Sequence, residues 1–236
     1  MGPGRAAEII REGLYRGADG GYLLTDRAFA GADTLATSYA LATAIKKIGD
    51  YDIIIGGRQA IDGDTAQVGP QVAEKLGLTQ VTYAEEILNV DEKNRSITVK
   101  RHIDGGVETV EGPLPIVITV NGSAAPCRPR NAKLVMKYKR ALGAQEKAPA
   151  PACHPEGVSA LPYPELYEKR PYLNIPEWSV ADVNGDLAQC GLSGSPTKVK
   201  AIQNIVFQAK ESKTLTSSDK DVEDLIVELL ANHTIG

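Results

Sequence analysis

The stretch YDIIIGGRQAIDGDTAQVGPQVAEKLG, Tyr51 to Gly77, decides the fold of this 236-residue chain. Its apolar run YDIII ends in two glycines, as a buried strand that stops abruptly would. A polar loop follows, and QVAEKLG then has the spacing of a helix that stops at Gly77. A strand, a loop and a helix in this order form the repeating unit of a parallel α/β sheet.

The flanking sequence repeats this rhythm and then changes it. Before the stretch, AAEIIREGLYRGAD predicts an amphipathic helix, GYLLT a short strand, and DTLATSYALATAIKKIG a helix that Asp33 caps. After it, residues 85–120 alternate with period two around the turn signals DEKN and DGG, and end in the apolar strand PIVITV. We therefore expect an α/β fold: a parallel sheet with an antiparallel β excursion.

The C-terminal part differs in composition. Residues 143–177 are rich in proline and alanine, which predicts an extended linker or a surface-wrapping arm. Residues 178–236 have too few apolar segments for a core of their own, so we expect them to pack on something else. Their last part predicts an amphipathic helix. The apolar residues that share one face of that helix are Val222, Leu225, Ile226, Leu229 and Leu230. The expected organisation is a domain over 1–142, a linker over 143–177 and an arm over 178–236.

Composition excludes several classes of function. The net charge is −4, with 26 basic and 30 acidic residues, which does not favour nucleic acid or an anionic membrane. The three cysteines lie far apart without zinc-site spacing, which fits a reducing compartment. No signal peptide or bilayer-spanning run is present, so we expect a cytoplasmic protein without membrane insertion. No triad or metal-ligand cluster is evident, so we expect no catalytic side chain and no metal, with chemistry carried by a cofactor.

The loop after the strand YDIIIGG is the first candidate site. Because Pro70 is tolerated only near a helix start, the amides of residues 64–68 should have few intrahelical acceptors. Free amides at a helix N-terminus favour a phosphate, and the side chains of Thr65 and Gln67 add donors. Two alternatives stand beside this hypothesis. Asp62 and Asp64 form a DxD pattern that could hold a metal, or they could simply shape a turn and cap the helix.

The second candidate is TDRAFAGADTLAT, Thr25 to Thr37, which follows the strand GYLL one βα unit earlier. Thr34 and Thr37 are three residues apart, so their hydroxyls share one helix face. Arg27 is placed to meet an anion or an electron-rich ring. We expect the two adjacent strand ends to share one ligand, with an ordinary capped helix as the alternative.

Together these segments resemble the beta subunit of electron transfer flavoproteins. GRQAIDGDTAQVGPQVAEKLGL resembles the nucleotide-binding loop of that family, and VKRHIDGGVETVEGPLPIVIT resembles its signature segment. CRPRNAKLVMKYKRA resembles the stretch that follows, and VEDLIVELL fits the final helix. The resemblance covers roughly residues 1–142. It implies a Rossmann-like fold of the adenine nucleotide alpha hydrolase type, with an extended C-terminal arm that contacts the alpha subunit.

The family is heterodimeric, with FAD on the alpha subunit and either AMP or a second FAD on the beta subunit. DRAFAGADTLAT and DGDTAQVGP look more like the electron-bifurcating branch, in which the beta-subunit FAD takes a hydride from NADH. Its electrons then go to the alpha-subunit FAD and to ferredoxin or flavodoxin, in the service of an acyl-CoA dehydrogenase. The resemblance places Arg27, Thr34 and Thr37 near that flavin. It also implies a phosphate contact for Gly57, Arg58, Gln59, Ala60, Ile61, Asp62, Gly63, Asp64, Thr65, Ala66, Gln67 and Val68.

One departure concerns the N-terminus. Members of the family begin with a strand like VVCVKQVPDT and a further helix and strand, on the order of 60 residues before a segment resembling MGP. We therefore expect a fragment or a miscalled start, and a chain that aggregates or binds flavin poorly. Two rival functions stay open at this point. One is an AMP-binding structural beta subunit, and the other is a metal-dependent glycosyltransferase built on Asp62 and Asp64.

Overall fold

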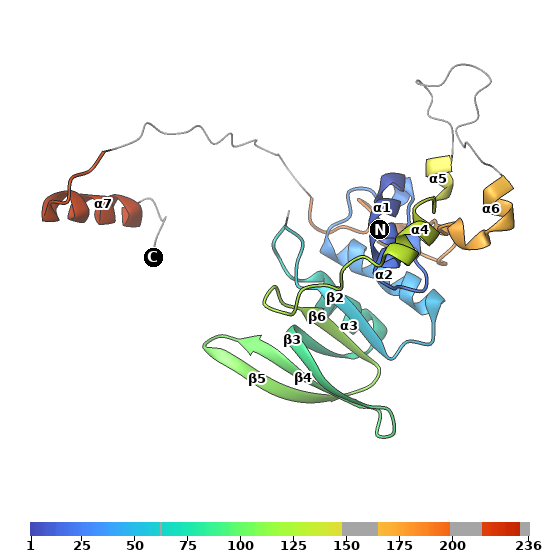
Figure 1. Cartoon of the computed structure of the whole chain (residues 1–236), viewed down its shortest axis with the longest axis horizontal. Helices are drawn as coiled ribbons and strands as arrows, with labels where there is room; N and C mark the ends of the chain where they lie inside the picture. The colour runs from blue at the N-terminus through green and yellow to red at the C-terminus, as the bar shows by residue number, and fades with distance from the viewer. Residues whose placement is uncertain (62, 148–164, 199–213, 232–236) are drawn as a thin grey trace, which may run out of the picture. The chain divides into compact units, whose positions relative to one another are not determined.

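The computed structural model describes residues 1–61, 63–147, 165–198 and 214–231. The chain divides into two units, Met1–Lys198 and Val199–Gly236, and each is described by itself. The first unit contains the main sheet and most of the helices (Figure 1). The second contributes one described helix.

The main sheet has five strands in the order β2-β6-β3-β4-β5. β2, β6 and β3 run parallel, whereas β3, β4 and β5 form an antiparallel meander. This arrangement confirms the predicted α/β fold with an antiparallel excursion. The strands are β2 (Ile53–Gly57), β3 (Thr79–Asp91), β4 (Ser96–Ile103), β5 (Gly106–Pro113) and β6 (Ile116–Val120).

β6 is the central strand of the parallel part. Its first four residues, IVIT, are all buried, as expected for a strand covered on both faces. Gly57 of β2 pairs with Val120 of β6, so these two strands end together at one edge of the sheet. The loop predicted to bind phosphate therefore leaves the sheet at the edge where open α/β folds bind ligands.

Helix α2 (Thr34–Ile48) begins and ends as the sequence predicts, and α3 (Val68–Leu76) ends as predicted but begins three residues before the expected QVAEKLG. The Asp33 carboxylate caps α2 by accepting the amides of Leu35 and Ala36 at 2.9 and 3.0 Å. Gly77 ends α3 in the left-handed conformation, with φ 66°. Pro70 is the third residue of α3, a position at which its missing N–H breaks no intrahelical hydrogen bond.

α3 approaches β6 closely through Gly69. A Cβ atom at this position would lie 2.3 Å from Cγ2 of Thr119, far inside van der Waals contact. Thr119 is 3% exposed and its hydroxyl accepts the amide of Tyr83 at 3.3 Å, so it has little room to move. Glycine at residue 69 therefore sets how closely the start of α3 lies on the sheet.

The strand GYLL does not join the main sheet. β1 (Leu23–Leu24) pairs in parallel with β7 (Glu177–Trp178) instead. The amides of Leu23 and Thr25 donate to the carbonyls of Pro176 and Trp178 at 2.9 Å, which holds β1 on β7. The prediction that β1 and β2 form adjacent strand ends is therefore wrong. β2 is an edge strand among the described residues.

The described ends of the proline-rich stretch pack on the first unit. Leu173 and Ile175 are 1% and 5% exposed in a cluster with Leu14 and Tyr138. Arg11 joins this region by a bidentate ion pair with Glu146 at 2.8–3.0 Å. The remaining helices of the unit are η1 (Gly4–Ala6), α1 (Ala7–Tyr15), η2 (Arg27–Phe29), α4 (Ala132–Tyr138), α5 (Ala144–Lys147), α6 (Glu165–Lys169), η3 (Pro171–Leu173) and η4 (Leu187–Gln189).

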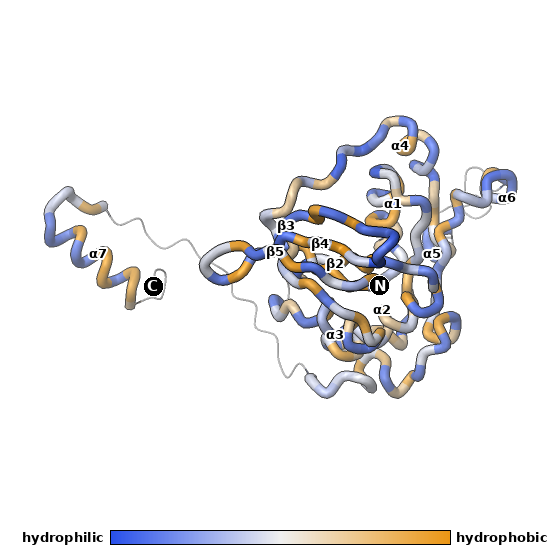
Figure 2. Tube along the Cα trace, turned by 90° about the horizontal axis from the view of Figure 1, so that it is seen from below, coloured by the Kyte–Doolittle hydropathy of each residue, from blue (hydrophilic) through white to orange (hydrophobic). Residues whose placement is uncertain are grey.

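The second unit contains helix α7 (Asp219–Ala231), which confirms the predicted C-terminal helix. Figure 2 shows hydrophobic and hydrophilic residues alternating along it. None of its residues is buried. Val222, Ile226 and Leu230 recur every four residues and are 45–49% exposed, so the described part of the unit leaves an apolar helix face uncovered.

Candidate nucleotide-binding site

The loop between β2 and α3 lies at the carboxyl edge of the parallel strands (Figure 1). Apart from adjacent residues, no described atom lies within 4 Å of the place where a Cβ would stand on Gly56, Gly57 or Gly63, so a ligand can approach these positions without meeting a side chain. Ile61 at the loop tip is 99% exposed. Asp62, the first aspartate of the DxD pattern, lies outside the described residues.

Five consecutive amides around the start of α3 are free within the described part of the chain. The N–H groups of residues 65–69 have no hydrogen-bond acceptor among the described residues. Asp64 differs from its prediction, because its amide donates to the carbonyl of Ala60 at 3.0 Å. The free group therefore begins at Thr65 and extends one residue further than predicted, to Gly69. This is the arrangement that attracts an anion to a helix N-terminus.

The backbone of the loop is strained at two non-glycine residues. Asp64 and Ala66 have φ values of 51° and 53°, in the left-handed region that such residues rarely occupy. Gln67 returns to the right-handed region with φ −91° and ψ −29°. When a residue in the left-handed helical conformation is followed by one in the right-handed conformation, their backbone amides point into one concavity, which is a known anion-binding geometry.

Helix α2 meets this loop through Thr34. The Thr34 hydroxyl donates to Oε1 of Gln67 at 3.0 Å, and Nε2 of Gln71 donates to the same hydroxyl oxygen at 3.4 Å. Oε1 of Gln71 is buried and has no hydrogen-bond partner among the described residues. An orphaned buried acceptor next to five free donors fits a site that a polar ligand completes.

Other predicted residues shape the loop. Nε2 of Gln59 donates to the carboxylate of Asp64, which closes the turn, and the guanidinium of Arg58 lies 5.8 Å from the ring centre of Tyr83. Among the residues that the structure describes, no group of three carboxylate, histidine or cysteine side chains could hold a metal ion. The contact that the structure shows for the Asp64 carboxylate is the hydrogen bond from Gln59, which shapes the loop.

Arg27 makes no side-chain hydrogen bond or ion pair to this loop among the described residues. It lines a cavity of about 520 Å³ together with residues of the N-terminus and of β1, and no partner for its side chain is found among the described residues. Thr37 is half-buried on α2 and makes no side-chain hydrogen bond to residues 57–68 in the described part of the chain. The structure thus brings Thr34 to the loop but not Arg27 or Thr37. The other residues of the cavity are Met1, Gly2, Pro3, Leu24, Thr25, Asp26, Phe29, Ala30 and Gln145.

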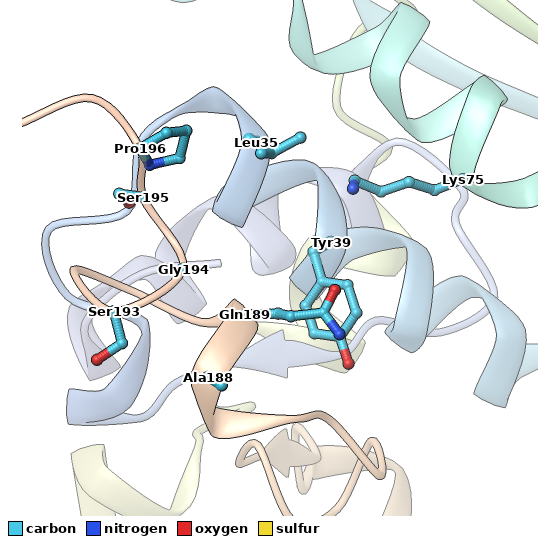
Figure 3. Close-up of a pocket in the computed structure, with 9 residues that line it drawn as sticks. All are labelled: Leu35, Tyr39, Lys75, Ala188, Gln189, Ser193, Gly194, Ser195 and Pro196. Atoms are coloured by element: carbon cyan, nitrogen blue, oxygen red, sulfur yellow. The ribbon is translucent and has the colours of Figure 1, made fainter.

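Sequence reasoning missed Gln71. It is four residues after Gln67, so both side chains lie on the same face of α3, and that spacing was the available signal. A second cavity of about 370 Å³ lies beside α2, between Leu35 and Tyr39 on one side and residues 188–196 on the other. Figure 3 shows Lys75 reaching toward it from α3. No helix in the described ranges is long and apolar enough to cross a bilayer.

The fold and this loop define an α/β protein of the nucleotide-binding type. The family model for the electron transfer flavoprotein domain matches residues 1–149. The chain therefore belongs to the electron transfer flavoprotein family.

Curated relatives agree with this assignment. Protein FixA of Azorhizobium caulinodans is 38% identical over 232 residues, covering 96% of this chain and 71% of the relative. The electron transfer flavoprotein subunit beta of Megasphaera elsdenii is 37% identical over 241 residues, covering 97% of this chain and 76% of the relative. The subunit of the same name from Clostridium acetobutylicum is 40% identical over 200 residues, covering 85% of this chain and 63% of the relative. The family assignment favours an electron transfer flavoprotein beta subunit over the glycosyltransferase hypothesis.

Proposed function

We propose that this chain is the beta subunit of a heterodimeric electron transfer flavoprotein and binds FAD at the loop between β2 and α3. The observation that carries the proposal is the row of free amides at residues 65–69 beside the orphaned acceptor of Gln71. Five donors at a positive helix end suit a phosphate group of the cofactor. The resemblance of DRAFAGADTLAT to the bifurcating branch supports FAD over AMP.

The side chains around the loop have separable roles in this proposal. The glycines at 56, 57 and 63 let the ligand approach the backbone, and Thr34 fixes the side chain of Gln67 beside the free amides. Arg27, at the cavity of about 520 Å³, supplies a cation without a carboxylate partner among the described residues. That volume falls within the range of small-molecule sites, so the cavity can hold a further part of the same ligand.

A bound FAD would supply the redox chemistry, taking a hydride from NADH and passing its electrons singly to the alpha-subunit FAD and to ferredoxin or flavodoxin. The protein would hold and orient the cofactor and exclude water from it. The electrons that reach the alpha subunit would serve an acyl-CoA dehydrogenase in the cytoplasm.

The C-terminal arm completes the heterodimer in this proposal. The face of α7 formed by Val222, Ile226 and Leu230 is apolar and uncovered among the described residues. An apolar face of this kind suits burial against another protein. The expected organisation has a nucleotide-binding domain over 1–142, a linker over 143–177 and an arm over 178–236. Residues 178–198 of this arm belong to the first unit, so we propose that the part which reaches the alpha subunit is the part after Lys198.

The test is anaerobic electron transfer by the heterodimer of this chain with its alpha subunit. With NADH, the dehydrogenase and its enoyl-CoA substrate present, ferredoxin or flavodoxin should be reduced. Without the enoyl-CoA, that reduction should stop, because both electrons must leave together. Ferredoxin reduction that does not depend on the enoyl-CoA, or none at all, would contradict bifurcation. An AMP-binding structural subunit would still pass electrons through the alpha flavin alone.

A further inference from the structure

The loop Asp26–Asp33, which we call the aspartate loop, is covered by residues 178–197, which we call the covering segment. The two are far apart in the sequence but share one hydrophobic cluster. In that cluster Phe29 of the loop packs with Val180, Val183 and Cys190 of the segment, and all four side chains are buried. The ligand-facing loop predicted from the sequence therefore has a second face that the C-terminal part of the first unit holds.

Both ends of the contact use an aspartate in the same way. Asp26 caps η2 with one carboxylate oxygen, which accepts the amide of Ala28 at 3.0 Å, and its other oxygen accepts the amide of Val180 at 3.1 Å. Asp33 caps α2 with Oδ1, and its Oδ2 accepts the amide of Thr197 at 3.1 Å. Each carboxylate thus joins a helix start to one end of the covering segment.

Ser195 adds a buried link at the Asp33 end. The amide of Asp33 donates to the Ser195 hydroxyl at 2.8 Å, and that hydroxyl donates to the carbonyl of Gly191 at 2.6 Å. Ser195 is 4% exposed, so its hydrogen bonds are shielded from water. Gly191 has φ 52°, and a Cβ there would lie 2.2 Å from the carbonyl oxygen of Ala28. Figure 3 shows Ser195 and Pro196 of this segment beside Leu35 in the first turn of α2.

The Asp33 end is also the end nearest the nucleotide loop. Thr34 follows Asp33 directly, and its hydroxyl donates to Gln67 at 3.0 Å. Thr197 is the residue before Lys198, where the first unit ends and the chain continues toward α7. The Asp33 carboxylate therefore lies between Thr34, which contacts the nucleotide loop, and the end of the first unit, from which the chain continues toward α7.

We propose that Asp33 is a positioning residue that couples nucleotide binding at the loop between β2 and α3 to the anchoring of the C-terminal arm. The inference rests on the proposed function, because it requires a nucleotide at that loop. Nucleotide that holds Gln67 and Thr34 in place also holds Asp33 on Thr197. Coupling between two sites is reciprocal, so an arm docked on the alpha subunit tightens nucleotide binding to the same extent.

The test uses the heterodimer with the alpha subunit, stripped of nucleotide, and compares Asp33→Asn with Asp186→Asn. Asparagine caps a helix as well as aspartate does, but its amide nitrogen cannot accept the Thr197 amide. Asp186 is the matched control, since it caps η4 within the covering segment and accepts from Ala188 and Gln189 without reaching the aspartate loop. Ser195→Ala is a second variant, which removes the acceptor of the Asp33 amide.

Two quantities are measured for each variant: the Kd for added FAD and for added AMP, and the hydrogen exchange of residues 190–198 with and without each nucleotide. In the wild type, nucleotide should slow exchange in these residues. Asp33→Asn and Ser195→Ala should weaken nucleotide binding about tenfold, within the usual range of coupling between sites, and abolish the change in exchange. Asp186→Asn should alter neither quantity. A purely structural role would lower protection equally with and without nucleotide.

The outcomes separate this inference from the proposed function. Suppose that the wild type binds FAD and that Asp33→Asn has the same FAD affinity and the same nucleotide-dependent exchange of residues 190–198. The coupling is then wrong and the proposed function stands. If the wild type binds AMP alone and Asp33→Asn weakens it, the FAD assignment is wrong and the coupling stands. An equal effect of Asp186→Asn overturns the coupling, and a wild type that binds neither nucleotide overturns both.

Discussion

Replacing Gly69 by alanine should loosen the start of α3 from the sheet and disturb the free amides of residues 65–69. The added Cβ would lie 2.3 Å from Cγ2 of Thr119, a buried atom on the central strand. Overpacking of this kind costs about 1–3 kcal/mol, and the better helix propensity of alanine returns about 1 kcal/mol. The expected net loss for Gly69→Ala is therefore about 0–2 kcal/mol.

A compensating change at Thr119 tests this reasoning. Thr119→Ser removes Cγ2, keeps the hydroxyl that accepts the Tyr83 amide, and costs about 1 kcal/mol for one buried methyl group. In the double variant the next atom is Cβ of residue 119, at 3.8 Å from the added methyl group, which is ordinary contact. The gain in helix propensity should then offset the lost methyl group, so the double variant should be close to wild type.

Hydrogen exchange of β6 and α3 in the heterodimer measures these effects. Gly69→Ala should speed exchange by up to about 30-fold, which corresponds to about 2 kcal/mol, and the double variant should restore it. Nucleotide affinity should follow the same order, because the amides of residues 65–69 move with the helix start. A double variant that loses the sum of the two single effects would refute the proposed packing contact.

Three further predictions concern other parts of the chain. The amides of Ala28 and Val180 lower the pKa of Asp26, and those of Ala36, Thr197 and Leu35 lower the pKa of Asp33 against the opposing effect of burial. These two carboxylates should therefore stabilise the covering segment at pH values above the pKa of a free aspartate, ~3.9, and lose that effect as the pH falls below it. Hydrogen exchange of residues 178–197 as a function of pH measures the change. A transition near neutral pH would contradict this prediction. Arg11→Met should lower the protection of α1 against hydrogen exchange by about 1–3 kcal/mol, because Glu146 is left half-buried without its partner. The double variant Arg11→Met with Glu146→Met should lose less protection. Equal losses in the two variants would argue against a stabilising ion pair. Ile226→Glu should weaken alpha-subunit binding at least tenfold in a pull-down titration, whereas Glu223→Gln on the same helix should not; unchanged binding of Ile226→Glu would remove α7 from the interface.

Local signals account for the parts of the fold that the sequence predicts. The period of the apolar residues gives α2, α3 and β6, and the caps at Asp33 and Gly77 give helix ends, because each depends on residues a turn or two apart. The free amides at 65–69 follow from the position of Pro70 for the same reason. The row differs from its prediction at both ends: it begins one residue later, since the Ala60 carbonyl accepts the Asp64 amide, and it extends one residue further, to Gly69.

Contacts between distant residues are what the sequence did not reveal. β1 pairs with β7 through partners 154 residues apart, and a two-residue strand contains no signal that selects its partner. The second oxygen of Asp33 accepts an amide 164 residues away, and only the first oxygen follows from the capping pattern. Arg27 is likewise placed by the packing of the aspartate loop and not by its own spacing from Thr34.

The central claim is that this chain holds FAD at the loop between β2 and α3. Mass spectrometry of the nucleotides released from the purified heterodimer tests it most directly, with a variant that alters the loop as control. Ala66→Pro removes one of the free amides and cannot adopt the φ of 53° found there. We expect FAD on both subunits and no AMP in the wild type, with the beta-subunit FAD lost in Ala66→Pro. AMP in place of the second FAD, or a second FAD that Ala66→Pro leaves fully bound, would contradict it.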